Sequence, residues 1–152
     1  MTGGRHRDRE EHWIHPYLIR PLVLSEEERR TDEALHVWLE AARFRRAANR
    51  ALRAYGVSFS QWRLLHAVER LVRETLDAVS ELDLARYTEM DVNTVSAVMH
   101  RLSGKGLLSW GPDAWGFSLR ILATEEGKAL LALTRGEVLH SFRDCQLRAR
   151  NA

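Results

Sequence analysis

The stretch Asp91–Leu108, DVNTVSAVMHRLSGKGLL, decides the fold of this chain because its apolar residues recur with the period of an α-helix. At about 3.6 residues per turn, one side of that helix gathers Val92, Val95, Val98, Met99 and Leu102. The opposite side carries small and hydrogen-bonding residues, namely Asn93, Thr94, Ala97, His100 and Arg101. A helix that reads base edges in the major groove of DNA needs such a packed back and unhindered front. The stretch therefore predicts a recognition helix that ends at Gly104.

The segments on both sides of this helix complete a winged helix-turn-helix. Before it, SELDLARYTEM predicts a short helix and a polar turn, and Asp91 is expected to cap the helix that follows. The apolar side of the short helix is assigned to Leu82, Leu84, Ala85 and Tyr87. After the recognition helix, Leu107–Trp110 and Phe117–Ala123 are rich in strand-forming residues, with turn formers between them. This pattern predicts a helix-turn-helix followed by a β-hairpin, which would be the wing.

The run LARYTEMDVNTVSAVMHRLSGKGLL, the hairpin after it and the following ATEEGKALL resemble the winged-helix core of the MarR family of bacterial transcriptional regulators. The resemblance covers the chain from about Val57 to Leu133, and SFSQWRLLHAV is similar to the family's preceding helix. It implies a homodimer with interlocking terminal helices, two winged modules on adjacent half-sites of double-stranded DNA, and often a small-molecule pocket. Two features depart from the family pattern. Ala97 stands where relatives usually carry an arginine, and the wing reads WGPDAWGF in place of an Asp-Arg-Arg type tip.

The candidate DNA-binding residues come from the predicted recognition helix and the second wing strand. They are Asn93, Thr94, Ser96, Ala97, His100, Arg101 and Arg120. Asn93 and Arg101 are expected to bond to base edges, and Ala97 to lie against a thymine methyl or simply to allow close approach. The hydroxyl side chains would contact phosphate, and the wing arginine would point either to phosphate or to solvent. An ordinary solvated helix face is the alternative for the whole set.

Aromatic side chains gather in two places. The predicted wing contains Trp110, Asp113, Trp115 and Phe117. Its rings could stack on sugar edges, close over a ligand or hold a protein partner, and one or two of them could instead pack into the core. A second group could line a cavity for a small aromatic effector, with core packing as the simpler alternative. This group is Tyr55, Phe59, Trp62 and His66.

Two long helices are expected to flank the winged module. Residues 32–55 lack Pro and Gly and predict one helix, capped by Thr31 or Asp32, and residues 124–151 predict another. Apolar residues cover more than one side of the first helix, as expected for a dimer interface. Its arginine stripe could approach DNA phosphates or acids of the other subunit, although such a stripe is more often a solvated face. The stripe consists of Arg43, Arg46, Arg50 and Arg53.

The predicted organisation is an N-terminal arm over residues 1–30, partly ordered, and a single winged-helix domain over residues 31–152. Within that domain, residues 57–123 form the DNA-binding module, and the two long helices serve dimerisation. The fold class is thus mainly α with a small β-hairpin. The length of 152 residues suits one domain, and no apolar run approaches the roughly 20 residues that span a bilayer. The charged N-terminus lacks the apolar core of a signal peptide, so we expect a cytoplasmic protein without membrane insertion.

Charge and residue types limit the function classes. The net charge is +2, but the segment from Val57 to Ala123 holds seven Lys and Arg against eight Asp and Glu, so the winged module itself is near neutral. Cys145 is the one cysteine, which excludes an intrachain disulfide and favours a free thiol. No metal site or other cofactor is expected, because three of the seven histidines lie on the arm without a carboxylate cage.

The sequence therefore predicts a sequence-specific transcriptional regulator that binds promoter DNA as a homodimer. The alternative is a winged-helix module that has lost DNA binding and holds a protein or a ligand. The sequence presents no nucleophile, glycine-rich phosphate loop or paired carboxylates, so it is not expected to be an enzyme.

Overall fold

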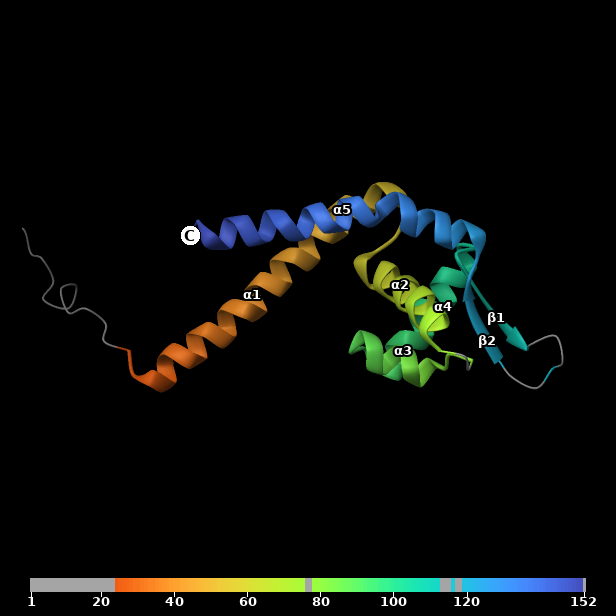
Figure 1. Ribbon diagram of the computed structural model, residues 1–152, viewed down its shortest axis with the longest axis horizontal. Helices are drawn as coiled ribbons and strands as arrows, with labels where there is room; N and C mark the ends of the chain where they lie inside the picture. The colour runs from red at the N-terminus through yellow and green to blue at the C-terminus, as the bar shows by residue number, and fades with distance from the viewer. Residues whose placement is uncertain (1–23, 76–77, 113–115, 117–118, 152) are drawn as a thin grey trace, which may run out of the picture. The chain divides into compact units, whose positions relative to one another are not determined.

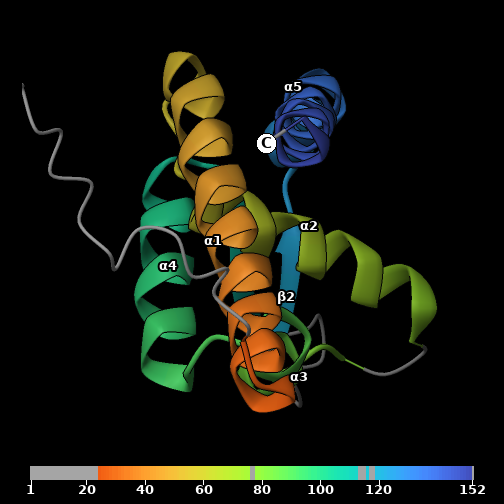
Figure 2. The same cartoon turned by 90° about the vertical axis from the view of Figure 1, so that its left-hand side faces the viewer.

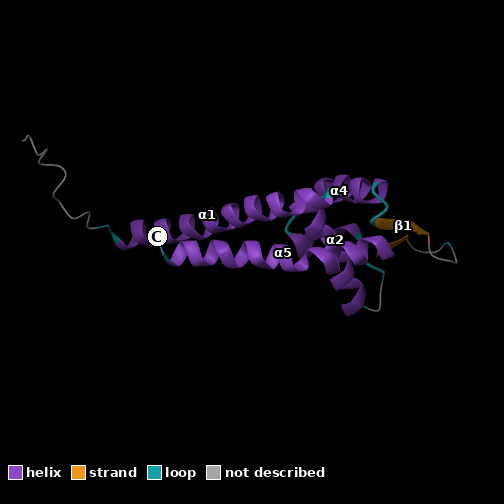
Figure 3. Cartoon of the chain, turned by 90° about the horizontal axis from the view of Figure 1, so that it is seen from above, coloured by secondary structure: helices purple, strands orange, loops and turns teal. Residues whose placement is uncertain are grey.

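The computed structural model describes residues 24–75, 78–112, 116 and 119–151. Its elements, in chain order, are α1 (Glu26–Leu52), a 3-10 turn (Arg53–Tyr55), α2 (Phe59–Glu74), α3 (Glu81–Thr88), α4 (Val92–Gly104), β1 (Leu108–Pro112), β2 (Leu119–Ala123) and α5 (Glu125–Arg150), as Figure 1 shows. Across these residues, the fold is mainly helical with one antiparallel hairpin, as predicted (Figure 3). The chain divides into two compact units, residues 1–35 and residues 36–152.

The described part of the first unit is the beginning of α1. The backbone N–H of Ser25 donates to Glu28 Oε2 at 2.6 Å, and the N–H of Glu28 donates back to Ser25 Oγ at 3.2 Å. The two bonds satisfy two donors at the helix start. Hydrogen bonding of the carboxyl to the backbone of Ser25, followed by that to its side chain, lowers the pKa of Glu28. The predicted start at Thr31 or Asp32 was therefore wrong. Thr31 is an interior residue whose hydroxyl donates to the carbonyl of Glu27 at 2.9 Å.

Helix α2 is the centre of the second unit. Its N-cap Ser58 and Gln61 form a reciprocal capping box, with both bonds at 3.2 Å. Leu64, Leu65 and Val68 are fully buried along its length. Helices α3, α4 and α5 and strand β2 all contact α2, so α4 and the hairpin are held against one element (Figures 1 and 2).

The apolar faces of α3 and α4 agree with the sequence pattern in their centres and differ at their edges. On α4, the predicted residues Val95, Val98, Met99 and Leu102 are buried. Val92, in the first turn, is 43% exposed, so its assignment to the packed face was wrong. On α3, the buried side is Leu84, Ala85 and Thr88, whereas Leu82 and Tyr87 are 49% and 46% exposed. These two residues lie off the side of α3 that faces the core, which corrects the predicted apolar face.

The hairpin passes directly into α5. Strand β1 pairs with β2 from Leu108 opposite Ala123 to Pro112 opposite Leu119, so β1 continues past the predicted end at Trp110. The helix predicted over residues 124–151 is α5, and Thr124 caps it by accepting from the N–H of Gly127 at 3.1 Å. Its hydroxyl also donates to the carbonyl of Gly106 at 2.6 Å, and its backbone N–H donates to the carbonyl of Leu107 at 3.1 Å. The first turn of α5 is thereby fixed to the segment that leads from α4 into the wing.

A buried polar contact ties α5 to α2. The indole Nε1 of Trp62 donates to Thr134 Oγ1 at 2.9 Å, and that hydroxyl donates to the carbonyl of Leu130 at 2.7 Å. Both polar groups are thus satisfied inside the core. In the part of the chain that the structure describes, none of the helices has the length and apolar character needed to cross a membrane.

Candidate nucleic-acid interface

The turn between α3 and α4 is built by backbone hydrogen bonds. Glu89 adopts the left-handed conformation, with φ of 55° and ψ of 33°, and the N–H of Met90 returns to the carbonyl of Ala85 at 3.2 Å. The guanidinium of Arg63 on α2 donates to the carbonyl of Thr88. This contact satisfies an otherwise free carbonyl at the end of α3 and fixes α3 to α2. The helix-turn-helix is therefore held by a side chain from outside the motif.

The first turn of α4 is capped by Asp91, as predicted. Its carboxylate accepts from the backbone N–H of Thr94 at 2.9 Å and from the Thr94 hydroxyl at 2.7 Å. The hydrogen bond from the Thr94 side chain, followed by that from its backbone, lowers the pKa of Asp91, so this group is ionised at neutral pH. The donor of the Thr94 hydroxyl is thus engaged in the cap, and a negative charge stands at the start of the candidate recognition helix.

The exposed front of α4 carries the predicted base-reading residues. Asn93, Ala97 and Arg101 are all exposed and follow i, i+4 spacing, so they share one stripe of the helix. Ser96 is half-buried beside that stripe. The structure therefore brings together the predicted asparagine, alanine and arginine on one accessible surface.

His100 and Trp110 form a contact between α4 and the hairpin. Their ring centroids lie 4.8 Å apart at an interplanar angle of 81°, an edge-to-face arrangement. Trp110 pairs with Ile121 across the hairpin and is half-buried against the core. His100 is thus partly engaged by the base of the wing. The other predicted wing residues, Asp113, Trp115 and Phe117, lie outside the described residues.

Arg120 is exposed on β2. Because side chains alternate along a strand, it lies on the face opposite to that of Ile121, which is buried. It borders a hollow of about 160 Å³ with the end of α2 and residues Ala78 and Val79. The structure thus does not place Arg120 in the stripe of α4.

Positive charge near α4 is sparse because several cations of the module are engaged internally. Lys105 donates to the carbonyl of Gly56 and to Gln61 Oε1, the latter at 2.9 Å, and Arg63 binds the carbonyl of Thr88. Arg70 and Arg73 form ion pairs within α2. Among the described residues, the cations of the 57–123 module without an ion pair or hydrogen bond are Arg86, Arg101 and Arg120. The interface therefore has few groups with which to neutralise phosphates.

Three of the residues predicted to line an effector cavity, Phe59, Trp62 and His66, form an aromatic series with Phe44 and Phe142. Phe44 contacts Phe142 and Phe59 with ring centroids 5.4 and 5.1 Å apart. Phe59 stacks on Trp62 at 6.2 Å, and Trp62 stacks on His66 at 5.2 Å. Phe59 and Trp62 are buried, and Tyr55 is half-buried against the core. Packing thus accounts for these rings.

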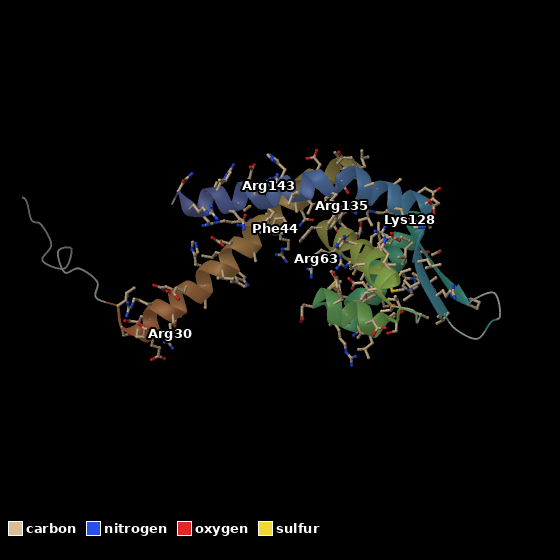
Figure 4. All side chains as sticks on the ribbon, in the orientation of Figure 1. Arg30, Phe44, Arg63, Lys128, Arg135 and Arg143 are labelled. Carbon is tan, nitrogen blue, oxygen red and sulfur yellow. The ribbon has the colours of Figure 1, made fainter. Side chains whose placement is uncertain are left out.

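His66 also borders an opening of about 580 Å³ between α2 and α5, which sequence reasoning missed. Its lining includes Arg70, Arg73, Lys128, Leu131 and Arg135, and Figure 4 labels Lys128 and Arg135 on α5. Burial, followed by the charges of Arg135 and Arg70, lowers the pKa of His66, which keeps its ring neutral at pH 7. A signal was present in the sequence, since Lys128, Leu131 and Arg135 recur at helical spacing on α5.

The remaining predicted features lie on α1 and α5. Arg43, Arg46 and Arg50 line a groove with the C-terminal half of α5, and Arg53 is not among its lining residues. Cys145 is a half-buried free thiol at that groove. In the described segments, no group of three or more His, Cys, Asp or Glu side chains could hold a metal ion.

The chain was compared with known proteins by sequence and by structure, and only the structural comparison found similar proteins. No protein-family model matches the sequence, and no curated protein is significantly similar to it. AbsC, a MarR family transcriptional regulator from Streptomyces coelicolor, has a TM-score of 0.64 at 16% identity, over 82% of each chain. CouR from Rhodococcus jostii RHA1, bound to p-coumaroyl-CoA, has a TM-score of 0.63 at 20% identity, over 74% of this chain and 76% of that one. MepR from S. aureus, in a complex with DNA, has a TM-score of 0.54 at 17% identity, over 74% of this chain and 73% of that one.

The structural neighbours are consistently MarR-family transcriptional regulators. This chain therefore has the MarR-like winged-helix fold that its sequence resembles, with its N- and C-terminal helices in contact. That fold is typically non-enzymatic.

Proposed function

We propose that this chain is a sequence-specific transcriptional regulator that binds promoter DNA as a homodimer. The observation that carries the proposal is the exposed stripe of Asn93, Ala97 and Arg101 on a helix whose opposite side is buried. The MarR-like fold supports it, and so does the structure of the neighbour MepR in a complex with DNA.

The chemistry of the stripe suits direct readout of a few base pairs. Asn93 can bond twice to the major-groove edge of an adenine, and Arg101 can do the same with a guanine. Ala97 between them leaves room for a thymine methyl. Asn93 and Arg101 are about 12 Å apart along the helix at about 1.5 Å per residue, which corresponds to roughly three to four base pairs. Each module would therefore read a short half-site.

The homodimer is supported by apolar side chains that the described chain leaves uncovered on α1 and α5. On α1 they include Val37, Trp38 and Leu39, and Trp38 is 66% exposed. On α5 they are Leu133, Leu139, Phe142 and Leu147. Apolar surface of this extent marks an interface, and we expect it to bury roughly 2,000 Å² in total or more. Sedimentation at micromolar concentration is expected to give the mass of a dimer, and a monomer would contradict the proposal.

A small aromatic effector is the second proposed partner. The opening between α2 and α5 has a volume within the usual range for ligand sites, and its lining includes the neutral His66 ring and apolar Leu131. Glu69 and Glu74 also line it and pair with Arg73 and Arg70, which leaves Lys128 and Arg135 as its further cations. The neighbour CouR is bound to p-coumaroyl-CoA, which carries an aromatic group. We infer that this opening, rather than the buried aromatic series, is where an aromatic effector of this chain binds.

The DNA proposal is tested by selecting duplexes from a random library and measuring their affinity by fluorescence anisotropy. Asn93→Ala or Arg101→Ala is expected to cost about 1 to 3 kcal/mol on the selected site and to relax the choice of base at one position. Ser103→Ala is the matched control, because Ser103 is exposed on α4 but lies off the stripe. A uniform loss on all duplexes would instead assign the residue to phosphate.

Salt dependence separates this function from the alternative of an interaction module that has lost DNA binding. That alternative is favoured by one observation, the small number of unpaired cations near α4. With three such cations in each of two subunits, the slope of log affinity against log salt is expected to be no steeper than about −5. If no duplex is selected even at low salt, the interaction module becomes the better description.

A further inference from the structure

The groove between α1 and the C-terminal half of α5 concentrates positive charge in one place. It has a volume of about 590 Å³ and is lined by Arg43, Arg46, Ala47, Arg50, His140, Ser141, Asp144, Cys145 and Arg148. Four guanidinium groups thus border one cavity, three from α1 and one from α5. Phe44, labelled in Figure 4, lies in the same turn of α1 as Arg43 and Arg46. Its ring contacts that of Phe142 on α5, which joins the two helices here.

These four arginines lack partners of opposite charge within the described part of the chain. The one carboxylate among the lining residues, Asp144, has its Oδ2 3.4 Å from His140 Nε2 and forms no ion pair with any of the four arginines. No ion pair or hydrogen bond joins Arg43, Arg46, Arg50 or Arg148 to another described residue. Four like charges around one cavity repel one another, and an anion between them would remove that repulsion.

The groove is remote from the surface that the proposed DNA interface uses. Helix α5 begins directly after the wing, and Asp144 lies about 28 Å farther along it at about 1.5 Å per residue. Figure 1 shows the C-terminal half of α5 extending away from the hairpin. Contact of α4 and the wing with one DNA duplex therefore does not involve these arginines.

We propose that this groove binds a phosphorylated small molecule that carries two or more negative charges. Arginine forks bind phosphate oxygens in pairs, and guanidinium groups on two sides of a cavity can hold two phosphate groups. The volume exceeds that of inorganic phosphate and matches a ligand of nucleotide size. Ala47 and Cys145 provide a small apolar part of the wall for the rest of such a ligand. The site is separate from the opening that contains His66.

Isothermal titration calorimetry of the full chain, without DNA and in magnesium-free buffer, tests the proposal. The probes are pyrophosphate and ATP, with adenosine as the uncharged comparison. Saturable binding of both phosphate probes and none of adenosine is expected. Arg46→Gln and Arg50→Gln are each expected to weaken ATP binding about tenfold, the usual effect of losing one charge-assisted hydrogen bond. The matched control is Arg45→Gln, since Arg45 is exposed on the same helix but does not line the groove.

Three results would overturn the proposed phosphate site. If Arg45→Gln weakens binding as much as Arg46→Gln, the effect is one of net charge and the site is wrong. If wild-type protein binds neither phosphate probe, while the double variant Arg46→Gln, Arg50→Gln sediments with a lower mass, the groove holds acidic residues of a second copy and the proposal is overturned. Absence of binding without a change of mass also overturns it. Because no DNA is present, these results do not depend on the proposed regulator function.

Discussion

Gly127 and Gly136 lie in the same helix, α5, yet replacing each by alanine is expected to have opposite effects. A Cβ atom at Gly136 would meet no heavy atom within 4 Å. At Gly127 it would lie closer than 3.0 Å to the carbonyl oxygen of Leu107 and 3.3 Å from Leu65 Cδ1. Gly136 therefore has room for a methyl group, whereas at Gly127 that space is filled by the backbone that leads into the wing.

The magnitudes follow from two opposing terms. Within a helix, alanine is favoured over glycine by about 1 kcal/mol, so Gly136→Ala is expected to stabilise the protein by about 0.5 to 1 kcal/mol. At Gly127 the same gain is opposed by overpacking of about 1 to 3 kcal/mol. Moving Leu107 away would also weaken its hydrogen bond from the N–H of Thr124, which is 3.1 Å long and contributes about 1 kcal/mol. Gly127→Ala is therefore expected to lose about 1 to 3 kcal/mol.

Urea unfolding followed by far-ultraviolet circular dichroism measures both changes. All variants are compared at one protein concentration, because dimerisation would make the apparent stability depend on it. Gly136→Ala serves as the internal control for helix propensity. A Gly127→Ala variant as stable as the wild type would refute the close approach of α5 to the Leu107 carbonyl.

Two further predictions concern ionisable groups. Asp91→Asn retains a cap oxygen for the N–H of Thr94 and removes a negative charge, so this variant is expected to bind DNA more tightly at a similar free energy of unfolding. Asp91→Ala is expected to lose about 1 kcal/mol of stability. Unchanged DNA affinity of the Asn variant would show that the phosphates lie away from this end of α4. Burial and nearby arginines lower the pKa of His66 from 6.5, so the folded state takes up this proton less readily than the unfolded chain. Stability is therefore expected to fall as the pH drops below 6.5, and His66→Gln to flatten this dependence in urea unfolding; an unchanged pH profile would contradict it.

The parts of the fold that the sequence predicted are those with strong local signals. Asp91 is a cap with a polar side chain at the required spacing, the helix over residues 124–151 opens with a Thr-Glu-Glu run, and the buried side of α4 follows a regular apolar period. The start of α1 was missed because an acidic run was assigned to an arm, although Ser25 followed by Glu28 is itself a capping box. Leu82 was misplaced because apolar residues on an eight-residue helix do not by themselves define which side faces the core.

The candidate site was predicted only where one helix determines it. The stripe of Asn93, Ala97 and Arg101 needs nothing beyond helical spacing, and the structure exposes all three. The opening at His66 and the arginine groove each require two helices distant in sequence, so their geometry depends on tertiary packing. Periodicity within α2 or α5 could indicate the lining residues but not which helix they face.

The small number of free cations in the winged module is a physical reason to expect that DNA is recognised through base contacts more than through electrostatic attraction to its phosphates. Non-specific affinity for DNA depends on neutralised phosphates, and the module offers few cations that are not already engaged. Arg63 and Lys105 use their charge to hold the motif together, which fixes the orientation of α4 at the expense of phosphate contacts. If α4 reads DNA as proposed, it would discriminate between sequences mainly through the fit of Asn93 and Arg101 to their bases. Two such half-sites read by one dimer would then add their discrimination, so a monomeric form of this chain would have little affinity for any duplex.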